Sequence, residues 1–245
     1  QIPGALEREG AKVYIASVNP SQTTEFRGEE LNKQLDQWKA KDRVAKFNLI
    51  GHSHGGPTVR YAAATRNDIA SVSTMSGTHH GSLVADKILA GTTPDGSFDK
   101  LATGGLQLIG WLTGNKTYES ADLKTALTAL SAQGAAAFNA RFPAGRNAER
   151  ANGQYFYSYA GNLVKTNGWD VSDALLSVTG EYYGGVANDG LVSPAEATWG
   201  KPIKMDLAWN HLDEVNQVLG ILGKGAPDPK AYYVSMANRL KWKLL

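Results

Sequence analysis

The stretch of residues 44–64 constrains the fold of this chain more than any other. It reads VAKFNLI, then Gly51-His52-Ser53-His54-Gly55, then GPTVRYAAA. The apolar run predicts a buried strand, and the residues after it, with Pro57 at a favoured first-turn position, predict a helix. Glycines beside Ser53 suit a strained strand-to-helix turn, where bulkier neighbours would clash with the backbone. We therefore interpret Ser53 as a nucleophile on an elbow, in preference to a turn serine in a Gly-rich loop.

The surrounding sequence alternates between strand and helix patterns. The segment Glu25–Ala40 places Leu31, Leu35 and Trp38 on one face of a predicted helix. Such alternation predicts an α/β fold with a mostly parallel sheet, covered by helices on both faces. Three short apolar runs are predicted to be its buried strands: Ala11–Val18, Val44–Ile50 and Ile69–Met75.

Between Leu83 and Phe142 the strand pattern disappears. An uncharged Gly-rich stretch is followed by an Ala-rich segment, Leu123–Phe142, that predicts a helix. We interpret about 83–142 as a helical lid inserted over the sheet, and an ordinary pair of core helices is the alternative. The apolar surface of this lid would come from Leu106, Leu108, Ile109, Trp111 and Leu112.

Composition excludes several other classes of protein. The 25 Lys and Arg against 23 Asp and Glu give a net charge of +2, too weak a field to predict nucleic-acid or membrane-surface binding. The absence of cysteine excludes disulfides, thiolate catalysis and Cys-ligated zinc. No run reaches the roughly 20 apolar residues that span a bilayer, and the first residues lack a signal-peptide layout. We expect one soluble domain over residues 1–245.

A serine nucleophile needs a base and an acid. In folds with this elbow the order along the chain is Ser, then Asp or Glu, then His, which selects His211 from the five histidines. His211 would act as the general base for Ser53, and the backbone N–H of His54 would face the developing oxyanion. Spacing leaves the acid open between Asp189, in an Asn-Asp-Gly turn, and four others: Asp170, Asp173, Glu181 and Asp206.

Six pieces of the chain together resemble the bacterial secreted triacylglycerol lipases of the Pseudomonas and Burkholderia type. The resemblance implies an α/β-hydrolase fold and hydrolysis of acylglycerol esters through an acyl-enzyme, with a short-chain carboxylesterase as the alternative. It also implies that Asp189 is the catalytic acid and His211 the catalytic histidine. The pieces are RGEEL (27–31), NLIGHSHGGPTVRY (48–61), HGS (80–82), AAAFNARFP (135–143), ANDGLV (187–192) and NHLDEVNQV (210–218).

The same resemblance implies a structural calcium ion, export from the cell and, in many relatives, a dedicated foldase chaperone. The calcium ligands would be the carboxylates of Asp170 and Asp213 and the backbone carbonyls of Gln217 and Ile221. Oxygen ligands of this kind suit a hard cation. Because Asp213 lies two residues after His211, the ion would hold the loop that carries the catalytic imidazole.

Two features depart from the family pattern. The family has a central strand before the position of Gln1, ending in His-Gly, that supplies a second oxyanion N–H, so we expect the sequence to be an incomplete copy or that strand to reside elsewhere. If the strand were truly absent, the chain could be catalytically incompetent, because loss of one oxyanion donor costs about 100- to 1,000-fold in rate. Many relatives also have a disulfide that a chain without cysteine cannot form.

Overall fold

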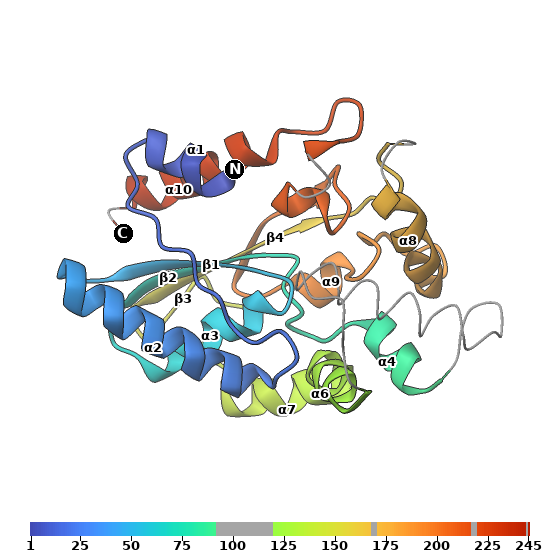
Figure 1. Cartoon of the computed structure of the whole chain (residues 1–245), viewed down its shortest axis with the longest axis horizontal. Coiled ribbons are helices and arrows are strands. Elements are labelled where there is room, and N and C mark those ends of the chain that lie inside the picture. Colours follow the sequence, from blue (N-terminus) through green and yellow to red (C-terminus); the bar gives the residue numbers. More distant parts are fainter. Residues whose placement is uncertain (92–119, 168–170, 217–219, 244) are drawn as a thin grey trace.

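A twisted five-stranded sheet lies at the centre of the molecule (Figure 1). The computed structural model describes residues 1–91, 120–167, 171–216, 220–243 and 245. The second strand lies between the first and the fourth, and all these pairings are parallel. The fourth strand also pairs antiparallel with the third and parallel with the fifth. The strands are β1 (Phe47–His52), β2 (Ile69–Met75), β3 (Arg150–Ala151), β4 (Gln154–Gly161) and β5 (Lys201–Leu207).

The mostly parallel sheet confirms the predicted α/β fold. Two of the three predicted strands are present as β1 and β2, and every residue of β2 is buried. The predicted helix at Glu25–Ala40 is α2 (Thr24–Asp42), whose N-cap Thr23 accepts a hydrogen bond from Phe26 N. The helix predicted after Ser53 is α3 (Gly55–Thr65).

The prediction that Ala11–Val18 is a buried strand was wrong. The segment forms no ladder, and Ile15 within it is 71% exposed. Its backbone instead bonds to a side chain of α2: Ser17 N donates to Gln34 Oε1, and Gln34 Nε2 donates to Ser17 O. A strand needs a neighbour that takes its N–H and C=O groups, and among the described residues β1 pairs only with β2.

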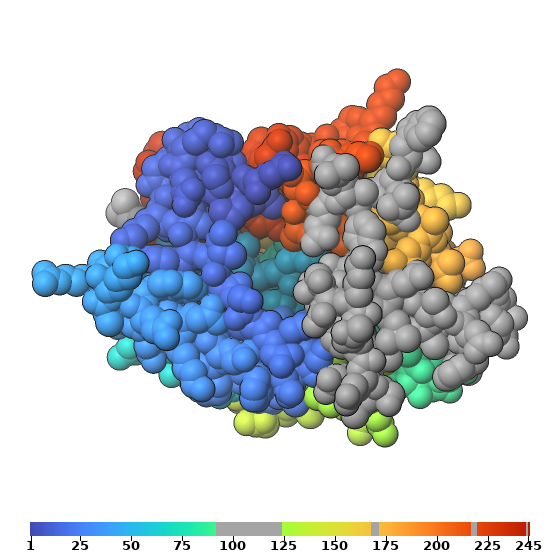
Figure 2. All heavy atoms as spheres, viewed as in Figure 1, coloured from blue at the N-terminus to red at the C-terminus, as the bar shows by residue number. Residues whose placement is uncertain are grey.

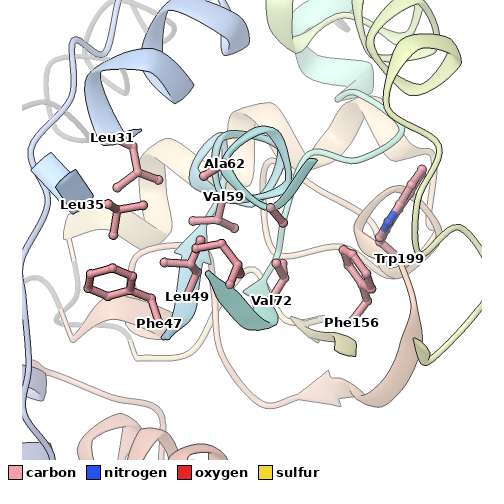
Figure 3. Packing of buried hydrophobic residues seen from close by; sticks show 11 residues of the cluster. Leu31, Leu35, Phe47, Leu49, Val59, Ala62, Val72, Phe156 and Trp199 are labelled. Atoms are coloured by element: carbon pink, nitrogen blue, oxygen red, sulfur yellow. The ribbon is translucent and has the colours of Figure 1, made fainter. Parts of the chain in front are cut away.

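Helices cover both faces of the sheet, as predicted. One core lies between the sheet and α2 and α3, where leucines of α2 meet Leu49, Val59 and Val72 (Figure 3). Another lies under α10 (Pro229–Trp242), which packs beside α1 (Ile2–Arg8) (Figure 1). Successive side chains of β4 point to opposite faces of the sheet: Phe156 enters the first core and Tyr157 the second.

The described part of the predicted insertion is helical. It contains α4 (Leu83–Leu89), α6 (Ser120–Leu130) and α7 (Ala132–Arg141). The helix predicted over Leu123–Phe142 is broken at Ser131, whose extended backbone ends α6 and whose Oγ caps α7 by accepting from Gly134 N. The predicted apolar lid surface, from Leu106 to Leu112, lies outside the described residues.

The remaining helical elements flank the loops of the candidate site. They are α8 (Val171–Gly180), η1 (Glu181–Tyr183), α9 (Pro194–Ala197) and η2 (Asp213–Val215).

Within the described residues, no helix combines the length and apolar character that crossing a membrane requires.

Candidate active site

Ser53 stands on a sharp turn between β1 and α3. Its φ of 55° lies in the left-handed region, which is uncommon for a residue with a side chain. Three hydrogen bonds hold this backbone: Ser53 N donates to Met75 O at 3.1 Å, and Ser53 O accepts from Gly56 N and Thr78 N. The end of β2 therefore fixes the strand-to-helix elbow that the sequence pattern predicted.

Gly51 of the motif and the adjacent Gly56 are required by close packing of the backbone, whereas a Cβ on Gly55 would have nothing within 4 Å. A Cβ on Gly51 would lie 2.3 Å from Gly55 O, and one on Gly56 would lie 2.8 Å from Gly77 Cα. Real Cβ atoms essentially never approach backbone atoms this closely. The strand and the helix can thus meet at Ser53 only if these positions lack side chains.

The side chain of His54 anchors the residue that follows Ser53. Its Nε2 lies 2.7 Å from Thr24 Oγ1 at the start of α2, and both residues are buried. Burial, reinforced by the charge of Arg27, holds the pKa of His54 well below its usual value. A neutral, hydrogen-bonded ring fixes this position, whose backbone N–H is the predicted oxyanion donor.

Asp189 and His211 form a fully buried pair. His211 Nδ1 lies 2.7 Å from Asp189 Oδ2, and both side chains are 0% exposed. His211 N also donates to Asp189 O at 2.9 Å, so the two loops are joined through backbone as well. Burial acts to raise the pKa of Asp189, but the charge and hydrogen bond of His211 outweigh it and leave the pKa lowered. An ionised carboxylate only accepts hydrogen bonds, so His211 Nδ1 is the donor in this contact.

No hydrogen bond joins Ser53 to this pair in the part of the chain that the structure describes. The ring of His52, one residue before Ser53, lies 4.5 Å from the ring of His211. His211 Nε2 is buried and has no hydrogen-bond partner among the described residues. Catalytic hydrogen bonds are often long in unliganded structures and tighten when substrate binds. Figure 2 shows the surface hollowed between the N-terminal segments (blue) and the C-terminal region (orange to red), with teal atoms from the β1–β2 region on the floor.

The other acids left open by spacing have different partners. Asp173 accepts from Thr166 N, Asn167 N and Asn210 Nδ2. Asp206 is exposed and pairs with Lys204, Glu181 is exposed on η1, and Asp170 lies outside the described residues. Among the described candidates, Asp189 is therefore the acid that contacts His211.

Glu214 is a member of the site that sequence reasoning missed. Its carboxyl group is fully buried; Oε1 accepts from Ser76 Oγ at 2.6 Å and from Gly161 N at 2.9 Å. Oε2 lies 3.0 Å from His52 Nε2 and 3.9 Å from His211 Nδ1. Burial, and next the charge of Asp189, raise the pKa of Glu214 well above its usual value. The available signal was an acid three residues after the predicted histidine.

The donor atoms of His52, His211 and Glu214 lie within 4.8 Å of one another, a spacing that a metal ion could use. Each has a hydrogen-bond partner within the site, however. His52 contacts Glu214, and His211 contacts Asp189. We therefore interpret the group as a hydrogen-bonded network.

Two of the four predicted calcium ligands, Asp213 and Ile221, lie among the described residues. Asp213 is 1% exposed, and its Oδ2 accepts from Asn210 N at 3.2 Å. Ile221 is partly buried on the following loop. Asp170 and Gln217 lie outside the described residues. A buried carboxylate next to the His211 loop fits the requirement of a hard cation for oxygen ligands.

Comparisons with known proteins agree with this fold. The model of the alpha/beta hydrolase fold family matches residues 9–173. A triacylglycerol lipase of Vibrio cholerae is 40% identical over 98% of this chain and 80% of its own, and one of Burkholderia plantarii is 32% identical over 98% and 79%. The solved structure of Staphylococcus hyicus lipase has a TM-score of 0.65 at 19% identity, covering 98% of this chain and 87% of its own.

A metagenomic carboxyl esterase has a TM-score of 0.68 at 17% identity, covering 99% of this chain and 69% of its own. These two structures show the fold, while the sequence relatives show the family. The chain therefore belongs to the α/β-hydrolase family, among the bacterial triacylglycerol lipases.

Proposed function

We propose that this protein hydrolyses the ester bonds of acylglycerols, with Ser53 as nucleophile, His211 as general base and Asp189 as the acid that orients His211. The observation that carries the proposal is the buried Asp189–His211 pair, 2.7 Å apart, beside a serine on a strained elbow. The described site is thus built for acyl transfer to a hydroxyl group.

The reaction follows from the positions of the protons. His211 Nε2 takes the proton of Ser53 Oγ as the oxygen attacks the ester carbonyl carbon, and the imidazolium then protonates the leaving alcohol. Water, deprotonated by the same nitrogen, then attacks the acyl-enzyme, and the proton passes from His211 Nε2 to Ser53 Oγ as the fatty acid is released. The backbone N–H of His54 and the positive end of the α3 dipole stabilise the negative oxygen of each tetrahedral intermediate.

Labelling with a phosphonate ester tests the nucleophile. We expect one phosphonate per chain on Ser53, found by mass spectrometry of peptides, and simultaneous loss of activity. S53A should abolish both, whereas S17A, a change at an exposed serine of the 11–18 segment, should alter neither. If the folded wild-type chain resists labelling, the catalytic proposal fails and the catalytically incompetent alternative takes its place.

Substrate form separates a lipase from a short-chain carboxylesterase. The helical insertion at about 83–142 is proposed as a lid that opens at a lipid surface. Activity on a medium-chain triacylglycerol should then rise sharply when the concentration passes the solubility limit and an emulsion forms. A rate that shows no such rise would favour the esterase.

Calcium is proposed to bind Asp170, Asp213, Gln217 and Ile221 and to fix the geometry of the His211 loop. Asp213, buried next to that loop, supports this placement. The ion would supply charge and rigidity to the loop, and the chemistry would remain with Ser53 and His211.

Export from the cell and help from a foldase are proposals that rest on the family. Refolding from denaturant tests the second. A yield of active enzyme that stays low without helper, and rises when a foldase from a related species is added, would support it. Full recovery without any helper would contradict it.

A further inference from the structure

Two polar side chains outside the proposed triad, the partly buried His52 and the fully buried Glu214, lie beside the His211 ring. The ring of His52 stands 4.5 Å from it, centroid to centroid, at an interplanar angle of 41°. Glu214 Oε2 holds His52 Nε2 at 3.0 Å. We propose that His52, anchored by Glu214, is a positioning residue that fixes the plane of the His211 ring, an inference that rests on the proposed function.

Asp189 alone leaves one rotation of the imidazole free. A single hydrogen bond from Nδ1 to Asp189 Oδ2 fixes one edge of the ring, but the ring can still tilt about that bond. Such a tilt would swing Nε2, which has no hydrogen-bond partner among the described residues, away from Ser53. A flat group against the ring face opposes this motion, and the ring of His52 is placed to do so.

The anchor of His52 is attached to rigid parts of the sheet. Glu214 Oε1 accepts from Ser76 Oγ, directly after β2, and from Gly161 N, the last residue of β4. His52 itself is the last residue of β1. The contact on His211 is therefore connected to the carboxyl ends of three neighbouring strands, which are more precise supports than loops.

Close packing fixes the position of the Glu214 carboxyl group, which anchors His52. A Cβ on Gly161 would lie 2.6 Å from Glu214 Oε1 and 2.4 Å from Trp209 O. The carboxyl group of Glu214 thus occupies a space from which a larger residue at 161 is excluded. His52 has 15% of its side chain exposed, whereas Glu214 has none, so the anchor is shielded from water while His52 faces the site.

A positioning role and a merely structural one make different predictions. A structural residue changes the fraction of folded enzyme, whereas a positioning residue changes the turnover of each folded molecule. The kcat per active site, counted by titration with the phosphonate ester, separates the two. Misplacement of a catalytic group by about 1 Å can cost roughly 100-fold in rate, so a tilted His211 should be visible in this measurement.

The test compares two replacements of His52 on a soluble short-chain ester. H52Q keeps a hydrogen-bonding group for Glu214 but removes the ring, and we expect kcat per active site to fall about 10- to 100-fold with KM little changed. H52F keeps the ring and loses the hydrogen bond, and should retain kcat within about threefold. E214A likewise removes the hydrogen bond of His52 but leaves its ring, so its loss of kcat should match that of H52F, and E214Q, which can keep both sets of hydrogen bonds, should lose less than E214A.

Full turnover of H52Q per active site would overturn the proposal, as would an equal loss in H52F and H52Q when thermal unfolding shows both to be folded. Failure of this inference is distinct from failure of the proposed function. In the first case the wild type is still labelled at Ser53 and active; in the second it is not labelled.

Discussion

Acid should destabilise this protein through His79, a buried histidine outside the proposed triad. His79 is 1% exposed, and its Nδ1 lies 3.2 Å from Arg60 Nη1. A guanidinium group only donates hydrogen bonds, so Nδ1 must accept, and the single ring proton resides on Nε2, 3.0 Å from Thr74 Oγ1. A second proton would have to lie between the ring and a cation. Burial, and then the charge of Arg60, accordingly lower the pKa of His79 well below the usual 6.5.

The sign and size of the effect follow from linkage. Since the pKa is lower in the folded state, the unfolded chain binds more protons, and stability is lost as the pH falls below about 6.5. Each pH unit below that value costs about 1.4 kcal/mol until the folded pKa is reached. Between about pH 7 and pH 5, His79 should therefore remove about 2 kcal/mol from the free energy of unfolding.

Urea unfolding followed by circular dichroism at the two pH values, at fixed calcium concentration, measures this loss. H79Q keeps an acceptor for Arg60 and a donor for Thr74 but cannot titrate, so its loss should be smaller than that of the wild type by about 2 kcal/mol. H80Q is the matched control, because the neighbouring His80 is partly exposed and should contribute less. Equal pH dependence in the wild type and H79Q would refute the reasoning.

Three further results are expected. D189N should lower kcat roughly 1,000- to 10,000-fold, because an amide N–H facing Nδ1 forces the His211 proton onto Nε2; a loss under tenfold would remove Asp189 from the triad. G190A should lower the melting temperature and the activity together, since φ is +102° and a Cβ would lie 2.6 Å from Leu176 Cβ. G184A, where φ is +56° and the space is open, should cost less, and equal effects would contradict the steric argument. Excess chelator should lower both the melting temperature and kcat, whereas unchanged values would exclude the proposed calcium.

Sequence patterns correctly predicted those elements whose structure depends on residues close to them in the sequence. The elbow could be predicted because its first glycine, Gly51, is required by a contact with the backbone of Gly55, only a few positions away. The same holds for α2, whose apolar face is formed by residues such as Leu31 and Leu35 that enter one core. In both cases the sequence itself carries the physical constraint.

The errors occurred where the structure depends on distant partners. The apolar alternation of Ala11–Val18 is typical of a strand, but a strand also needs a ladder partner, and the backbone of Ser17 bonds to Gln34 of α2 instead. The break at Ser131 is a different kind of error: serine favours helix caps over helix interiors, but the Ala-rich pattern continues on both sides of it. Glu214 was missed because its partners, Ser76 and His52, are 138 and 162 residues away.

Asp189 is both a turn-forming residue and the proposed catalytic acid. Its Oδ1 accepts from Leu191 N and Val192 N, which shapes the turn, while its Oδ2 faces His211 Nδ1. Turn formation alone would accept Asn as well as Asp, since both offer one such oxygen. Only a carboxylate has a second acceptor for the imidazole N–H. The hairpin-like appearance of the Asn-Asp-Gly sequence and its proposed role in the triad therefore use different atoms of one side chain, and a substitution that preserves the first use can abolish the second.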